Sequence, residues 1–70
     1  MDRAENIGWR IKNCRQAKHL TQKELAAKTG CTHCSISHWE EGVRYMSVYN
    51  LMLLCDALGV SANYLLTGKE

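Results

Sequence analysis

Residues Gln22–Glu40 read QKELAAKTGCTHCSISHWE, and this stretch decides the fold. Where it begins, Thr21 and Glu24 have the spacing of a capping box, in which each side chain accepts a hydrogen bond from the other residue's backbone N–H. Gly30 then provides the left-handed backbone conformation through which helices commonly end. We therefore expect a short helix that begins after Thr21 and ends near Gly30.

A second short helix is expected to follow directly. Thr32 is a good N-cap residue, and beyond it Ile36 and Trp39 are three residues apart, so they share one face of a helix. Ala26 provides a small side chain in the first helix, where the second helix has to cross it. Two short helices joined by a turn that contains glycine form a helix-turn-helix unit, which places its second helix in the major groove of DNA.

The chain resembles the Cro and phage-repressor type of helix-turn-helix family, often called the Xre type. Three runs carry the resemblance, namely LTQKELA at 20–26, SISHWEEG at 35–42 and ALGVSANYLLTG at 57–68. They occur in order and at compatible spacing, and the resemblance covers nearly the whole chain. It implies an all-α fold, a compact five-helix bundle of the phage-repressor DNA-binding-domain type with the helix-turn-helix at its second and third helices.

Length and composition favour a single helical domain over residues 1–70. The chain contains no proline, and its apolar residues follow helical spacing. The formal net charge is only +2, so DNA binding requires Arg and Lys to cluster on one face. The N-terminus lacks the apolar segment of a signal peptide, and the longest apolar run, 51–55, is too short to span a bilayer. These features favour a cytoplasmic protein.

Three more helices are expected around the central pair. The first runs from near Asp2 or Glu5 to Lys18, while Ser47 and Ser61 are N-cap residues for the fourth and fifth. The side chains expected to face the core from these helices are Ile7, Ile11, Cys14, Val48, Leu51, Leu54, Cys55, Leu58 and Leu65, with Tyr64 or Leu66 beside the last.

Base contacts are expected from the start of the third helix. In the family that the chain resembles, residues there reach base edges, and the matching positions are His33, Cys34, Ser37 and His38. Because Ile36 and Trp39 are expected to face inward, these four positions lie on the solvent side. A neutral histidine donates or accepts a hydrogen bond, and a protonated one donates from both nitrogens, which suits purine acceptors. The alternative is that both histidines are only exposed polar residues; within this motif we expect at least one base contact.

Phosphate contacts are expected first from Gln22. It lies at the beginning of the second helix, where free N–H groups and the helix dipole favour an anion. Further candidates are Lys23, Arg44, Arg10 and Ser35. For Lys23 and Arg44 the alternative is a solvated surface charge. Such contacts set the register and affinity of a DNA-binding protein but carry no sequence information.

The resemblance assigns a structural role to Arg15 and Glu40. In the resembled family the matching residues form an ion pair between the first and third helices, largely shielded from water. The pair would hold the recognition helix at its angle, and removal of one partner would cost several kcal/mol. Neither residue is expected to read a base.

Excess apolar residues suggest a homodimer. A helix-turn-helix dimer binds half-sites about one helical turn apart, roughly 34 Å. The candidate dimer surface consists of Met52, Leu53, Tyr45, Met46, Tyr49, Tyr64 and Trp9, which are more apolar side chains than one small core requires. The alternative is that Trp9 and Tyr49 simply flank the core.

The four cysteines provide a competing interpretation. Cys31 and Cys34 form a C-x-x-C pair with His33 inside it. A structural zinc site requires four ligands, usually from two such pairs, and no second pair is present. We therefore expect no metal or cofactor. Cys34 is expected to be exposed near a helix N-terminus, where its oxidation would place a bulky or charged group on the DNA-facing side.

The sequence as a whole predicts a sequence-specific double-stranded DNA-binding transcriptional regulator. It is expected to act as a repressor, as a homodimer on an inverted-repeat operator. No catalytic constellation is present, because Ser35 and Ser37 near His38 lack a supporting acid and an oxyanion site; no enzyme activity is expected. Two other classes remain open, a helical protein-interaction module such as an antitoxin or adaptor, and a cysteine-based redox or metal sensor.

Overall fold

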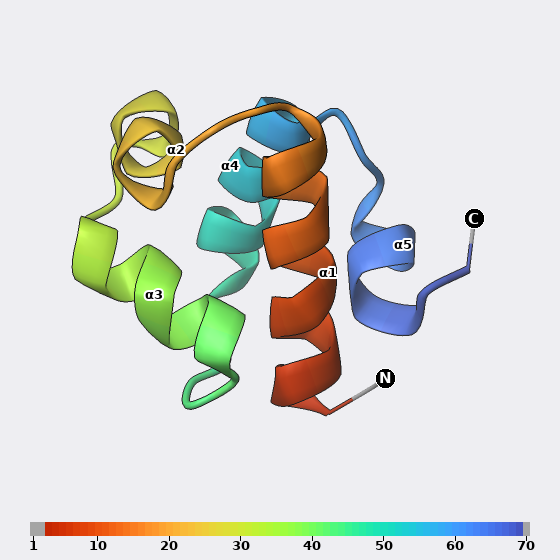
Figure 1. Ribbon diagram of the computed structural model, residues 1–70. Coiled ribbons are helices and arrows are strands. Elements are labelled where there is room, and N and C mark those ends of the chain that lie inside the picture. Colours follow the sequence, from red (N-terminus) through yellow and green to blue (C-terminus); the bar gives the residue numbers. More distant parts are fainter. Residues whose placement is uncertain (1–2, 70) are drawn as a thin grey trace.

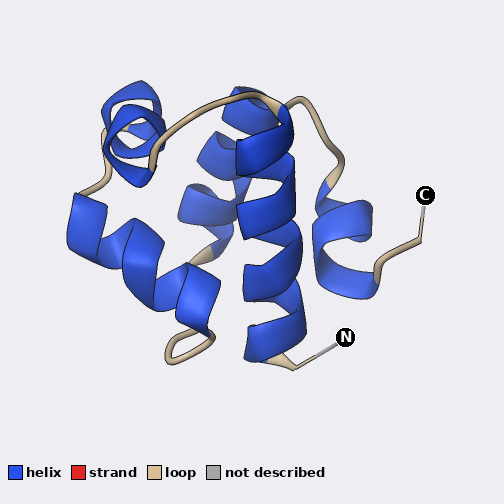
Figure 2. Ribbon diagram, in the orientation of Figure 1, coloured by secondary structure: helices blue, strands red, loops and turns tan. Residues whose placement is uncertain are grey.

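The computed structural model describes residues 3–69, and these residues form five α-helices and no strand (Figures 1 and 2). The helices are α1 (Ala4–Ala17), α2 (Gln22–Thr29), α3 (His33–Glu41), α4 (Val48–Leu58) and α5 (Ala62–Thr67). The prediction of an all-α five-helix bundle is confirmed. Of the two predicted starts of α1, Asp2 lies outside the described residues, and the helix begins one residue before Glu5. Within residues 3–69, no helix combines the length and apolar character needed to cross a membrane.

Local capping determines where most of the helices begin. The Thr21 hydroxyl oxygen accepts a hydrogen bond from the Glu24 N–H at 3.0 Å, and the Glu24 carboxylate accepts one from the Thr21 N–H at 2.8 Å. The side chains of Thr32, Ser47 and Ser61 cap α3, α4 and α5 in the same position. Each cap satisfies a backbone N–H that has no partner within its helix. The predicted starts of these four helices are confirmed because capping depends on residues adjacent in sequence.

One apolar core holds the five helices together. Its members are Ile7, Ile11, Leu25, Ala26, Ile36, Trp39, Leu51, Leu54, Leu58 and Leu65, and the partly buried Cys14, Cys31, Cys55, Tyr64 and Leu66 pack against them. Every helix contributes to this core, so burial of one face of each helix stabilises the arrangement as a whole. The expectation for Val48 is wrong, because its side chain is 74% exposed. Val48 is the first residue of α4, and the first residue of this helix that is buried in the core is Leu51.

The contact between α1 and α3 depends on Gly8. Helix α1 packs most extensively against α3, which lies beside it in Figure 1. A Cβ atom at Gly8 would lie 2.2 Å from the carbonyl oxygen of Trp39 and 2.6 Å from that of Glu40. Only a residue without a side chain allows the two backbones to approach this closely. Gly8 therefore sets the distance between α1 and the helix that is expected to read DNA.

Candidate nucleic-acid interface

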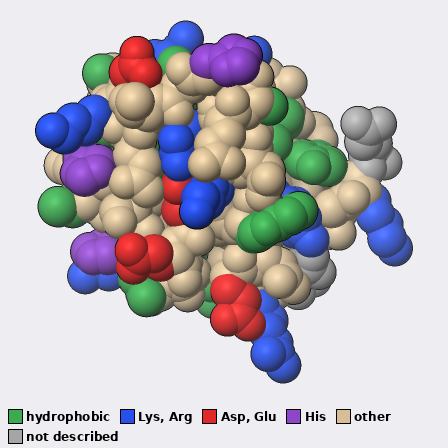
Figure 3. Space-filling model, viewed as in Figure 1, with side chains coloured by type: hydrophobic (Ala, Val, Ile, Leu, Met, Phe, Trp, Pro, Cys, Tyr) green, Lys and Arg blue, Asp and Glu red, His purple; other side chains and the backbone are tan. Residues whose placement is uncertain are grey.

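The outer face of α3 carries the four residues expected to contact bases. His33 and Cys34 are exposed, and Ser37 and His38 are half-buried. On the inner face, Ile36 is completely buried and Trp39 is 6% exposed. Figure 3 shows histidine side chains on the surface in the region of α3. The Ser37 hydroxyl also donates a hydrogen bond of 3.3 Å to the Glu41 carboxylate. The structure therefore places the four residues together on one accessible side of a helix.

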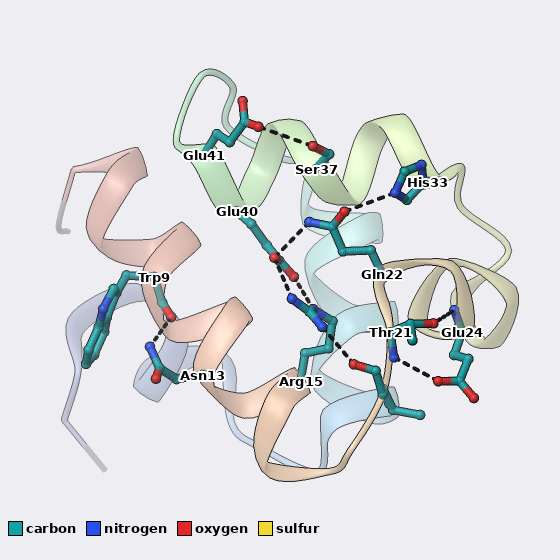
Figure 4. Close-up of polar contacts among 11 residues, drawn as sticks. Trp9, Asn13, Arg15, Thr21, Gln22, Glu24, His33, Ser37, Glu40 and Glu41 are labelled. Atoms are coloured by element: carbon teal, nitrogen blue, oxygen red, sulfur yellow. Dashed lines mark hydrogen bonds and ion pairs between the residues drawn. The ribbon is translucent and has the colours of Figure 1, made fainter.

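A buried ion pair attaches α3 to α1. Arg15 Nε lies 2.6 Å from Glu40 Oε2, and Arg15 Nη2 donates to Glu40 Oε1 at 3.1 Å (Figure 4). Only 10% of the Arg15 side chain and 3% of the Glu40 side chain are exposed. The third arm of the guanidinium, Nη1, donates to the carbonyl of Leu20 at 2.7 Å, between α1 and α2. This fork links the helix-turn-helix to α1 with the planar, two-bond geometry that arginine and a carboxylate adopt.

A hydrogen-bonded chain runs from this ion pair to the surface of α3. Gln22 Nε2 donates to Glu40 Oε1 at 3.0 Å, and Gln22 Oε1 lies 3.0 Å from His33 Nε2 (Figure 4). The sequence singled out Gln22, Glu40 and His33 for three separate roles and did not connect them. No sequence signal reveals the connection, because Gln22 belongs to α2 and the other two residues to opposite ends of α3. The three side chains meet only because the two helices pack together.

The candidate phosphate-contacting residues are not all in one place. Gln22 begins α2, and Lys23 is the next residue of that helix and is exposed. Arg44 is exposed in the loop after α3. Ser35 is half-buried, and its hydroxyl oxygen accepts a hydrogen bond from the Thr32 hydroxyl at 3.0 Å, within the cap of α3.

Arg10 is separated from the other candidates. Its Nη1 donates to the carbonyl of Leu65 in α5 at 2.9 Å. On α1, Arg10 is about 200° around the helix from Gly8, which faces α3. In Figure 1, α5 and α3 accordingly lie on opposite sides of α1. Its guanidinium therefore serves the packing of α5, and the structure does not bring it to the surface formed by α2 and α3.

The candidate dimer surface divides into exposed and packed residues. Trp9 is 63% exposed, Tyr45 60%, Tyr49 69% and Met52 59%. Met46 and Tyr64 are instead partly buried against the core, and Leu53 is half-buried. Tyr45 and Met46 also line a shallow apolar groove together with Ile7, Val48, Leu51 and Leu66. Of the exposed apolar side chains, Tyr45 in the loop before α4 and Val48 at the start of α4 thus line this groove.

The cysteine residues are all free thiols. Burial raises the pKa of the Cys14 thiol, and burial together with the nearby Asp56 carboxylate raises that of Cys55. Cys31 packs against the core, whereas Cys34 is exposed. Within residues 3–69, no three His, Cys, Asp or Glu side chains are grouped so that they could hold a metal ion.

Comparison with known proteins identifies the family. A family model described as helix-turn-helix matches residues 11–65. The chain belongs to the Cro and phage-repressor, Xre-type helix-turn-helix family. This result confirms the resemblance carried by the three sequence runs.

Several relatives of this Xre-type chain are informative. It is 37% identical over 70 residues to the HTH-type transcriptional regulator y4dJ of Sinorhizobium fredii, covering 100% of this chain and 91% of that protein. It spans about half the length of other curated relatives that it matches, such as 52% of the regulator YqaE of Bacillus subtilis. These relatives are transcriptional regulators and not enzymes, which agrees with the expectation for this chain.

The fold also matches solved structures of DNA complexes. The P22 c2 repressor in complex with a synthetic operator superimposes with a TM-score of 0.87 and 33% sequence identity, covering 90% of this chain and 96% of that one. SinR, described as a master regulator of biofilm formation, was solved in complex with DNA; it superimposes with a TM-score of 0.82 and 34% identity, covering 86% of this chain and 97% of that one.

Proposed function

We propose that this protein is a sequence-specific double-stranded DNA-binding transcriptional regulator that acts as a repressor. The observation that carries the proposal is the outer face of α3, where His33, Cys34, Ser37 and His38 share one accessible side of the helix. Residues at the N-terminal end of a recognition helix contact base edges in the major groove. The similarity to the DNA-bound P22 c2 repressor and SinR supports this orientation of α3.

The same docking places the beginning of α2 at the DNA backbone. The first N–H groups of α2, the side chain of Lys23 and that of Arg44 are the proposed phosphate contacts, with Gln22 and Ser35 at the edge of this surface. Arg10 is left out because it is engaged with α5. If each subunit neutralises about four phosphates, the slope of log affinity against log salt is roughly −3.6 per half-site.

The protein is proposed to bind as a homodimer. One recognition helix reads only a few base pairs, and a two-fold dimer reads an inverted repeat with half-sites about 34 Å apart. Tyr45, Tyr49 and Met52 are the exposed apolar residues that would be covered, next to the groove that Met46 and Val48 line. Apolar side chains grouped on the surface of a small domain favour association.

Selection of bound duplexes from a randomised DNA pool at moderate salt tests the proposal. Two enriched inverted half-sites, centred about one helical turn apart, are the expected result. His38→Ala should relax selection at one position in each half-site. His19→Asn is the matched control: His19 lies in the α1–α2 connection at a φ of 58°, which asparagine tolerates, so selection should be unchanged. An unenriched pool from folded protein would refute specific DNA binding and favour a protein-interaction module.

A further inference from the structure

The ion pair on α3 determines the direction of the hydrogen bonds that lead to the surface. The Glu40 carboxylate accepts two hydrogen bonds from Arg15 and is almost completely shielded from water. An ionised carboxylate only accepts hydrogen bonds. Any further polar group that contacts Glu40 Oε1 must therefore donate a hydrogen to it.

Gln22 is that group, and its amide has only one suitable orientation. With Nε2 toward Glu40, the amide donates a hydrogen bond of 3.0 Å. The reversed amide would place its carbonyl oxygen 3.0 Å from a carboxylate oxygen, with no hydrogen between them. The amide nitrogen therefore faces Glu40, and the amide oxygen faces His33 at 3.0 Å.

The orientation of Gln22 determines where His33 carries its proton. Since Gln22 Oε1 has no hydrogen, the hydrogen bond requires one on His33 Nε2. In a neutral imidazole the other nitrogen, Nδ1, then carries a lone pair and accepts hydrogen bonds. Nδ1 has no hydrogen-bond partner within residues 3–69, and it points away from Gln22 in Figure 4.

We propose that Glu40, acting through Gln22, holds neutral His33 as its Nε2–H tautomer, so that Nδ1 reads an amino group in the major groove. Adenine N6 and cytosine N4 are the amino donors there, whereas guanine and thymine present acceptors at the corresponding positions. The base-reading step rests on the proposed function, in which α3 enters the major groove. A neutral histidine can donate or accept a hydrogen bond, and the proposal specifies that His33 accepts one from the base.

The tautomer is measured on the free protein, without DNA. Long-range ¹H–¹⁵N correlation of the histidine rings, at alkaline pH where imidazole is neutral, distinguishes the protonated nitrogen from the unprotonated one. His33 is expected to show one tautomer, with the proton on Nε2. Gln22→Met keeps the side-chain length and removes the amide, so His33 should then become a mixture of tautomers. A proton on Nδ1 in the wild type, or equal populations in the two proteins, would overturn the proposal. If Gln22→Met does not fold, the wild-type spectrum still tests the proposal, because a detectable His33 population protonated on Nδ1 would overturn it.

The base preference is then measured on the selected operator. At the position where His33→Ala relaxes selection, wild-type protein should prefer adenine or cytosine about fivefold or more, the lower end of the effect of one mismatched base pair. If the preferred base is adenine, it can be replaced by purine, which lacks the 6-amino group. This replacement should lower the DNA affinity of the wild type by the same factor and leave the affinity of His33→Ala unchanged. A preference for guanine or thymine overturns the readout. Absence of any selective binding overturns the proposed function, while the tautomer still tests the hydrogen-bond chain by itself.

Discussion

Replacing Gly8 with alanine has two opposite effects on stability, a gain in helix propensity and a steric clash with α3. Alanine in a helix interior is favoured over glycine by about 0.8–1.0 kcal/mol. Against this gain, the new Cβ would lie 2.2 Å from the Trp39 carbonyl oxygen, whereas real Cβ contacts are essentially never shorter than 3.0 Å. The end of α3 would have to recede from α1 by at least 0.8 Å, and backbone atoms cannot rotate away as a flexible side chain can.

The cost of this displacement should exceed the gain in helix propensity. Overpacking a tightly packed contact costs about 1–3 kcal/mol, occasionally more. Moving Glu40 also strains the ion pair to Arg15, for which loss of one partner costs about 3–5 kcal/mol. With overpacking of about 2 kcal/mol, a partial loss of the ion pair of about 1–2 kcal/mol and the propensity gain subtracted, we expect Gly8→Ala to lower the free energy of unfolding by about 2–3 kcal/mol. In a domain of this size, that corresponds to a fall in Tm of roughly 10–20 °C.

Urea denaturation followed by far-UV circular dichroism measures this difference. Gly30→Ala is the control, because Gly30 has a φ of +72° but no atom within 4 Å of a Cβ placed there. It should cost only the strain of a left-handed alanine, about 1–2 kcal/mol. If Gly8→Ala were as stable as the wild type or more stable, α3 would tolerate displacement without cost, and the reasoning about close approach would be refuted.

Three further predictions concern the ion pair, the capping box and the thiols. Arg15→Met and Glu40→Gln should each lower the free energy of unfolding by about 3–5 kcal/mol, and the double variant by less than their sum in a double-mutant cycle; additive losses would contradict the pairing. The pKa of Glu24 is lowered from its ordinary 4.5, first by a hydrogen bond with the backbone of Thr21 and then by one with its side chain. The contribution of Glu24 to stability is therefore present above pH 4.5 and is lost as the pH falls through the lower pKa of the folded state. The stability difference between wild type and Glu24→Gln, measured from neutral to acidic pH, should therefore disappear in acid; a constant difference would argue against this linkage. Iodoacetamide should alkylate the exposed Cys34 before Cys14, whose pKa is raised by burial, and peptide mass spectrometry that found equal rates would disprove the assignment.

The features predicted correctly from sequence are mostly local. Thr21, Glu24 and Thr32 cap the helices of the central pair where expected, because a cap involves residues only three positions apart. Periodicity was less informative at the ends of elements. Val48 has the spacing of a core residue, but spacing does not show where the core ends, and its side chain is exposed. Arg10 was a further candidate for a phosphate contact, whereas its guanidinium donates to the carbonyl of Leu65 in α5.

The sequence by itself determined the starts of α2, α3, α4 and α5, the family and the residues on the outer face of α3. Only the tertiary structure decided that Gly8 lets α3 approach α1 and that Gln22 joins Glu40 to His33. The physical reason is that capping and periodicity act between near neighbours in the chain, whereas hydrogen bonds such as the one between Gln22 and Glu40, 18 residues apart, depend on how the helices pack. The direction of each hydrogen bond, and with it the proton on His33, follows from that packing.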